Sequence, residues 1–85
     1  NNNNEKNLVS LKNDVNANDD YLDKISLEKT NLELLDKNYQ VGLISYLDTI
    51  QSRTTVIQLQ QQQIQSKTEC LIDSMNLYKA LAGQL

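Results

Sequence analysis

The sequence predicts an all-α fold, a long antiparallel helical hairpin that packs as a coiled coil. The prediction rests on three observations: the chain has 85 residues, it has no proline and only two glycines, and Gly42 lies almost at its midpoint. Proline and glycine interrupt helices, so two unbroken stretches flank one interruption. Aromatic content is 5%, all tyrosine, which is too little for a sandwich, barrel or doubly wound core. Hydrophobic content of 39% is too high for a disordered chain.

The interruption at Gly42 divides the chain into two helical arms. We expect a first long helix over residues 1–40 with frayed first residues, a tip turn over 41–44, a second long helix over 45–82, and a tail over 83–85. At a rise of 1.5 Å per residue, an arm of about 36 residues extends on the order of 50 Å.

The turn carries the chemistry of a helix end and a helix start. Gly42 can adopt the left-handed conformation that ends a helix, with Lys37 placed favourably in the last turn and Leu43 as a hydrophobic contact. Ser45 and Asp48 have the spacing of a capping box. In such a box the Ser45 hydroxyl accepts from the amide of residue 48, and the Asp48 carboxylate accepts from the amide of Ser45.

The second helix carries a strict seven-residue repeat, which predicts a coiled-coil seam with a left-handed supercoil. One position of the repeat is strongly apolar and the interleaved position is partly polar. These two sets are Ile50, Ile57, Ile64, Leu71 and Tyr78, and Leu47, Thr54, Gln61, Thr68, Met75 and Ala82. We therefore expect Tyr78 to pack in the core.

A second apolar stripe of the second helix lies off that seam and consists of Val56, Leu59, Leu77 and Leu81. A helix that is apolar on two sides contacts two neighbours, so we expect the isolated hairpin to self-associate, for example as a four-helix bundle.

The first helix is less regular than the second. Its heptad pattern is interrupted by Asn18 and Lys29, and this predicts a shift of phase along the helix. The pattern begins with Leu8, Leu11, Val15, Leu22 and Ile25, and it resumes with Leu32, Leu35 and Tyr39.

The composition excludes several function classes. There is no histidine and only one thiol, Cys70, so His-based catalysis, a Cys–His pair and a Cys/His zinc site are excluded. The net charge of −3 argues against a nucleic-acid partner, and the apolar runs are too short for a membrane-spanning helix. We expect no enzyme activity, no cofactor and no bound metal. The asparagine-rich opening, without Met or an apolar leader, suggests a partial or processed chain.

Two segments carry a family resemblance. Residues 39–50 are YQVGLISYLDTI, followed after one residue by Ser-Arg-Thr, and residues 76–81 are NLYKAL. Both resemble, in register, the turn and the closing segment of the second periplasmic hairpin of TolC-like outer-membrane efflux proteins. The resemblance covers residues 39–81, about half of the chain, and residues 5–38 match only in helical character.

The resemblance implies a trimeric channel in the outer membrane of a Gram-negative bacterium, with this segment in the periplasm. It implies partners as well: two further copies of the full-length protein, a periplasmic membrane-fusion adaptor and an inner-membrane pump that together export drugs or other small molecules. It assigns three sets of residues by position. These are adaptor-contacting residues Val41, Gly42, Leu43 and Ser45, tunnel-mouth candidates Tyr39, Asp48 and Gln51, and the closing segment Leu77, Tyr78, Lys79, Ala80 and Leu81.

Some residues depart from the family pattern and leave an alternative open. Gln51 stands where many relatives have Asp, Ile44 stands where some have Arg, and residues 82–85 replace a Gly-Gly-Gly-Trp ending. Locally, Asp48 can act purely as a cap and Tyr39 can pack across the turn. The alternative to a channel segment is a freestanding antiparallel coiled-coil scaffold or interaction module.

Overall fold

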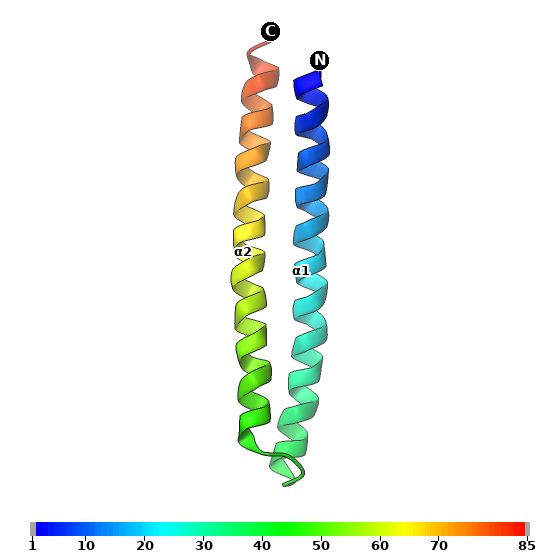
Figure 1. Ribbon diagram of the computed structural model, residues 1–85, viewed down its shortest axis with the longest axis vertical. Coiled ribbons are helices and arrows are strands. Elements are labelled where there is room, and N and C mark those ends of the chain that lie inside the picture. Colours follow the sequence, from blue (N-terminus) through cyan, green and yellow to red (C-terminus); the bar gives the residue numbers. More distant parts are fainter. Residues whose placement is uncertain (1, 85) are drawn as a thin grey trace.

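The computed structural model describes residues 2–84, and it is a two-helix hairpin. Helix α1 spans Asn2–Gln40 and helix α2 spans Tyr46–Ala82. The helices lie side by side and run antiparallel, so the turn is at one end and both termini are at the other (Figure 1). The molecule measures 65 × 14 × 13 Å. This confirms the predicted all-α helical hairpin; Asn1 and Leu85 lie outside the described residues.

Charges at the helix ends favour both helices. Glu5 lies in the first turn of α1 and Lys37 in its last turn, and Asp48 and Lys79 occupy the same places in α2. Acidic groups near a helix N-terminus and basic groups near its C-terminus interact favourably with the helix dipole. Within the described residues, neither helix has an apolar stretch long enough to cross a membrane.

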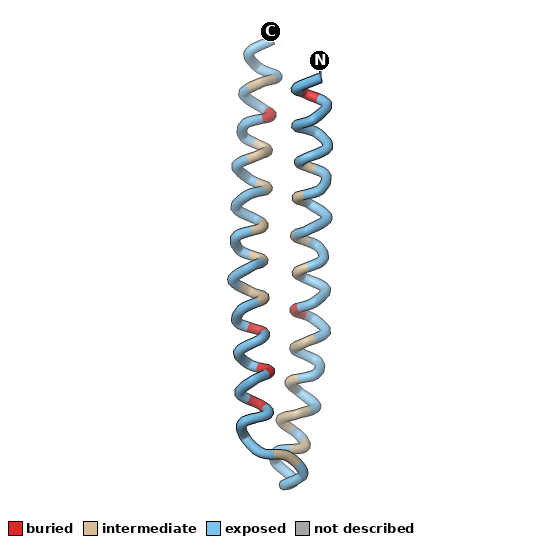
Figure 2. The backbone as a smooth tube through the Cα atoms, viewed as in Figure 1, coloured by how far each residue is buried: buried red, intermediate tan, exposed pale blue. Residues whose placement is uncertain are grey.

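The helices meet along one seam of buried and half-buried residues, which face each other across the hairpin in Figure 2. The seam repeats every seven residues on both helices, as in a coiled coil. On α1 it contains Asn4, Leu11, Asp14, Asn18, Tyr21, Ile25, Glu28, Leu32 and Leu35, and on α2 it contains Thr49, Ser52, Val56, Leu59, Gln63, Ser66, Cys70, Asp73, Leu77 and Ala80.

The face of α2 predicted to form the seam points away from α1 instead. Ile50, Ile64 and Tyr78 are 42%, 61% and 74% exposed, so the predicted seam and the predicted core packing of Tyr78 are wrong. The second stripe makes the contact: Val56 and Leu77 are each 7% exposed. Both stripes have the same period, and periodicity does not tell which of two apolar faces meets the neighbouring helix.

The phase shift predicted for α1 is also wrong, because Asn18 belongs to the seam. Its side-chain oxygen accepts a hydrogen bond from Nε2 of Gln63 at 2.9 Å, so a polar residue fills a seam position without being left unpaired. Ile25 and Leu32 keep the same phase on either side of Lys29. Three residues predicted to lie on the seam are exposed beside it: Leu8, Val15 and Leu22.

Buried apolar side chains are few in this seam. Among the described residues they are Ile25, Val56 and Leu77. Between them, Ser52 Oγ donates to Glu28 Oε1 at 2.7 Å. A buried polar pair is satisfied in only one register of two antiparallel helices, so such contacts select the alignment more than they add stability.

We predict that Leu77→Ala lowers the free energy of unfolding by about 2–3 kcal/mol, because it removes a buried side chain from the seam. The matched control is Leu27→Ala, since Leu27 is 73% exposed on α1 and its loss costs less than about 0.5 kcal/mol. Urea denaturation followed by circular dichroism measures both. Equal losses in the two variants would contradict the seam described above.

Candidate functional site

The tip is a short, hydrogen-bonded turn that ends α1. Gly42 has φ +81°, the left-handed conformation expected from the sequence. The amide of Leu43 donates to the carbonyl of Asn38 at 2.9 Å, and the amide of Gly42 donates to the carbonyl of Tyr39 at 3.0 Å. This pair of bonds is the Schellman motif, which satisfies carbonyls that the helix end leaves free.

The predicted capping box at the start of α2 is wrong. Ser45 is the N-cap residue with extended backbone (φ −80°, ψ 158°), but its side chain makes no capping hydrogen bond. Its hydroxyl donates to Asp48 Oδ2 at 3.4 Å instead, and the Asp48 amide bonds to the Ser45 carbonyl at 3.2 Å. Aspartate is one methylene shorter than the glutamate of the usual box, so its carboxylate meets the hydroxyl and not the Ser45 amide.

The tip presents apolar side chains to solvent. Val41 is 71% and Leu43 is 73% exposed, so the hydrophobic contact expected of Leu43 is absent. Behind them the rings of Tyr39 and Tyr46 pack with centroids 5.2 Å apart and planes at 54°, a favourable tilted geometry that joins the two helices across the turn. The four adaptor-contacting candidates Val41, Gly42, Leu43 and Ser45 therefore lie together on one braced surface.

Two of the three tunnel-mouth candidates lie together in a groove between the helices. Asp48 and Gln51 line this groove, whereas Tyr39 packs on Tyr46 outside it. The other lining residues are Glu28, Asn31, Leu35, Ser52 and Thr55.

This groove belongs to a flank of the hairpin that gathers carboxylates. We call this side of the hairpin the acidic flank; its residues recur at the same heptad positions along both helices. One basic residue, Lys24, also lies at one of these positions. All three acidic residues of α2 lie on it, and none lies on the opposite flank. The carboxylates of the acidic flank are Asp14, Glu28, Asp48, Glu69 and Asp73.

The opposite flank carries an ion pair that the sequence did not suggest. Arg53 Nη2 contacts both carboxylate oxygens of Asp36, at 2.9 and 2.8 Å. Arg53 is 48% exposed and Asp36 is 33% exposed, so water still reaches the pair and it contributes at most about 1 kcal/mol. Asp36 and Arg53 come together only because of the register in which the two helices pack. The sequences of α1 and α2 taken separately therefore do not show the ion pair.

Asp14 has an unusual environment within the acidic flank. Its hydrogen bond with Asp73, then burial, then the negative charges of Asp73 and Glu69 raise the pKa of Asp14 from 3.8 to about 6. Its Oδ2 atom is buried and accepts from no donor group among the described residues. A bond between two carboxyl groups needs a proton on one of them, so protonation satisfies this oxygen.

The family closing segment lies at the end of the hairpin away from the tip. Leu77 is buried and Ala80 is half-buried against α1. Tyr78, Lys79 and Leu81 are exposed, so this segment is divided between the seam and the surface.

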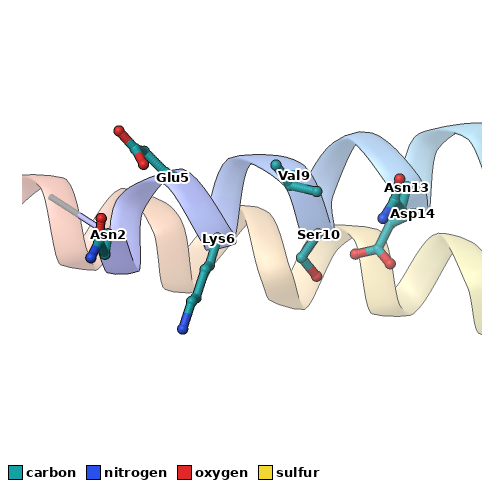
Figure 3. Close-up of a pocket in the computed structure, with 7 residues that line it drawn as sticks. All are labelled: Asn2, Glu5, Lys6, Val9, Ser10, Asn13 and Asp14. Carbon is teal, nitrogen blue, oxygen red and sulfur yellow. The ribbon is translucent and has the colours of Figure 1, made fainter.

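The end of the hairpin away from the tip also has a hollow on its surface. One hollow near the termini is lined by α1 alone, by residues between Asn2 and Asp14. In Figure 3, Glu5 and Lys6 of this hollow point to opposite sides of the helix. In the described part of the chain, no group of three or more Cys, Asp or Glu side chains is placed to hold a metal ion.

Comparison with family models, curated proteins and solved structures gives no match.

We predict that Gly42→Ala destabilises the hairpin by about 1 kcal/mol, because a side chain is strained at positive φ. No other atom lies within 4 Å of a Cβ placed there, so the cost is conformational and not steric. The control is Gly83→Ala: Gly83 has φ −67°, and its new Cβ would meet Lys79 O at 3.4 Å, an ordinary contact. Thermal melts compare the two, and equal stability would contradict the role of Gly42.

We predict that the hairpin is more stable at pH 5 than at pH 7.5. Since the pKa of Asp14 rises from 3.8 to about 6 on folding, the folded state holds a proton that the unfolded state loses between these values. Stability from this group is therefore lost as pH rises towards and past about 6.

The variant Asp14→Asn should raise the melting temperature at pH 7.5 and reduce the difference between the two pH values. The control is Asp20→Asn, which changes an exposed carboxylate of α1 outside the acidic flank. If Asp14→Asn melts with an unchanged pH dependence, Asp14 does not carry the effect.

Proposed function

We propose that this hairpin is a periplasmic tunnel segment of a TolC-type outer-membrane channel, and that its tip engages a membrane-fusion adaptor. The observation that carries the proposal is the tip: exposed Val41 and Leu43 on a braced turn at the end of a 65 Å hairpin. The same residues lie in the segment that resembles the family. In this proposal the channel exports drugs or other small molecules, and the protein is not an enzyme.

The tip is suited to a helical partner for a physical reason. Two exposed apolar side chains on a flexible loop would be ordered at an entropic cost when a partner binds. Here the Schellman bonds and the Tyr39–Tyr46 contact already hold the backbone. Val41 and Leu43 can therefore be buried against an adaptor hairpin without the entropic cost of ordering the turn. The adaptor would act by displacing whole tips.

The acidic flank is the side of the hairpin that suits the interior of the tunnel. In a trimer, three copies of Asp48 would form a ring beside Gln51 and Glu28, which share its groove. A ring of carboxylates in a narrow mouth concentrates cations by focusing the field. In this proposal the acidic flank faces the tunnel, and the flank with the Arg53–Asp36 pair faces outwards.

A freestanding coiled-coil module is the second candidate. The outward apolar heptad of α2 favours it, because that face suits helical partners in any assembly. The encoding gene separates the two: a channel gene also encodes a secretion signal, β-strand segments and a second related hairpin. An open reading frame limited to the hairpin would contradict the channel.

The tip is tested by Leu43→Asp in the full gene. Leu43 is 73% exposed, so the change leaves folding intact but places a charge in the proposed apolar contact. We expect accumulation of a fluorescent efflux substrate such as ethidium to rise to the level of the gene deletion, with normal amounts of channel in the outer membrane.

The matched control is Leu27→Asp, because Leu27 is equally exposed at 73% but lies along α1, far from the turn. It should retain efflux. Full efflux by Leu43→Asp, or an equal loss in both variants at normal channel levels, would contradict a specific role of the tip.

A further inference from the structure

We propose that the outward face of α2 binds the same face of a second copy, with the two α2 helices antiparallel about a two-fold axis. The inference concerns the 85-residue chain itself and does not rest on the proposed channel. The outer face, as we call it, consists of Leu47, Ile50, Thr54, Ile57, Gln61, Ile64, Thr68, Leu71, Met75 and Tyr78.

The outer face is a better apolar seam than the one that holds the hairpin together. Its seven large apolar side chains are between 42% and 74% exposed. The inner face of α2 has Thr49, Ser52, Gln63, Ser66 and Asp73 at the corresponding positions. A surface apolar stripe of this length is rare on a monomer and marks an interaction site.

The hairpin exposes more surface than a compact chain of its mass. A compact chain of 9.7 kDa exposes about 5,100 Å², whereas this hairpin exposes 6395 Å². The excess of about 1,300 Å² is spread over the whole elongated hairpin, and a second copy that covers one long face removes part of it from water.

A second helix fits this face without displacing α1. With a heptad repeat, the outer face is rotated by about 150° from the inner seam around the α2 axis. A helix packed there therefore lies on the far side of α2. Two hairpins joined in this way form a four-helix layer with the two α2 helices in the centre.

The outer face is complementary to itself when the helices are antiparallel. In the register centred between residues 61 and 64, the coiled-coil layers pair each polar residue with an apolar one. The layers are Leu47 with Tyr78, Ile50 with Met75, Thr54 with Leu71, Ile57 with Thr68, and Gln61 with Ile64.

The charges of α2 are compatible with this contact. Its carboxylates all lie on the acidic flank, so the outer face and its borders carry only cations. In the same register Arg53 lies opposite Ser74 and Lys67 lies opposite Gln60 of the other copy. No like charges face each other, which would otherwise oppose the association.

The test is sedimentation equilibrium on the chain and two charge-matched variants. We expect the parent chain to be a dimer and Ile64→Lys to raise the dimer dissociation constant roughly 100-fold, because it places a charge at the centre of an apolar contact. The control Gln62→Lys adds the same charge on another face and should stay dimeric. Ile64 is 61% exposed, so the helical content by circular dichroism should be unchanged.

Orientation is tested by disulfide trapping in a Cys70→Ser background. An antiparallel contact predicts that Ile50→Cys and Met75→Cys, mixed together, cross-link to each other and not to themselves. A monomeric parent, dissociation of the Gln62→Lys control to the same extent as Ile64→Lys, unchanged dimers of Ile64→Lys, or cross-linking of Ile50→Cys to itself would each overturn the proposal.

Discussion

The short connection between Gln40 and Tyr46 is the constraint on which the rest of the structure depends. The Schellman bonds fix the direction in which the chain leaves α1, and extended Ser45 fixes where α2 begins. With so few residues between the helices, α2 cannot rotate freely about its axis. The turn thereby selects the face with Val56 and Leu77 for α1 and leaves the Ile50–Tyr78 heptad in solvent.

The selected seam is narrow, and polar contacts give it its register. Three buried apolar side chains among the described residues 2–84 are a small core. A chain of 85 residues has little stability to spare. The Glu28–Ser52 and Asn18–Gln63 bonds are satisfied only when the helices are aligned as observed. Sliding one helix by a heptad would bury these groups without partners, which costs more than the bonds themselves contribute.

The sequence predicted the hairpin and the conformation of Gly42 because both follow from local chemistry: helix formers without breakers, and one residue that tolerates positive φ. It did not predict the seam. The apolar repeat that includes Ile57 is the stronger pattern, yet pairing depends on the turn and on α1, which periodicity within α2 does not contain. Asn18 interrupts the apolar pattern of α1 taken alone, because its partner, Gln63, is far away in the chain. The acidic flank and the Asp36–Arg53 pair likewise depend on the register between the helices.

The placement of both termini at one end has a mechanical consequence (Figure 1). A force applied to the two ends of the chain pulls α1 and α2 apart at their open end, so it loads one layer of the seam at a time. The same seam pulled along the helix axes would have to break all its layers together. The hairpin is therefore expected to open gradually from the termini towards Gly42, and its local stability should increase along the same path.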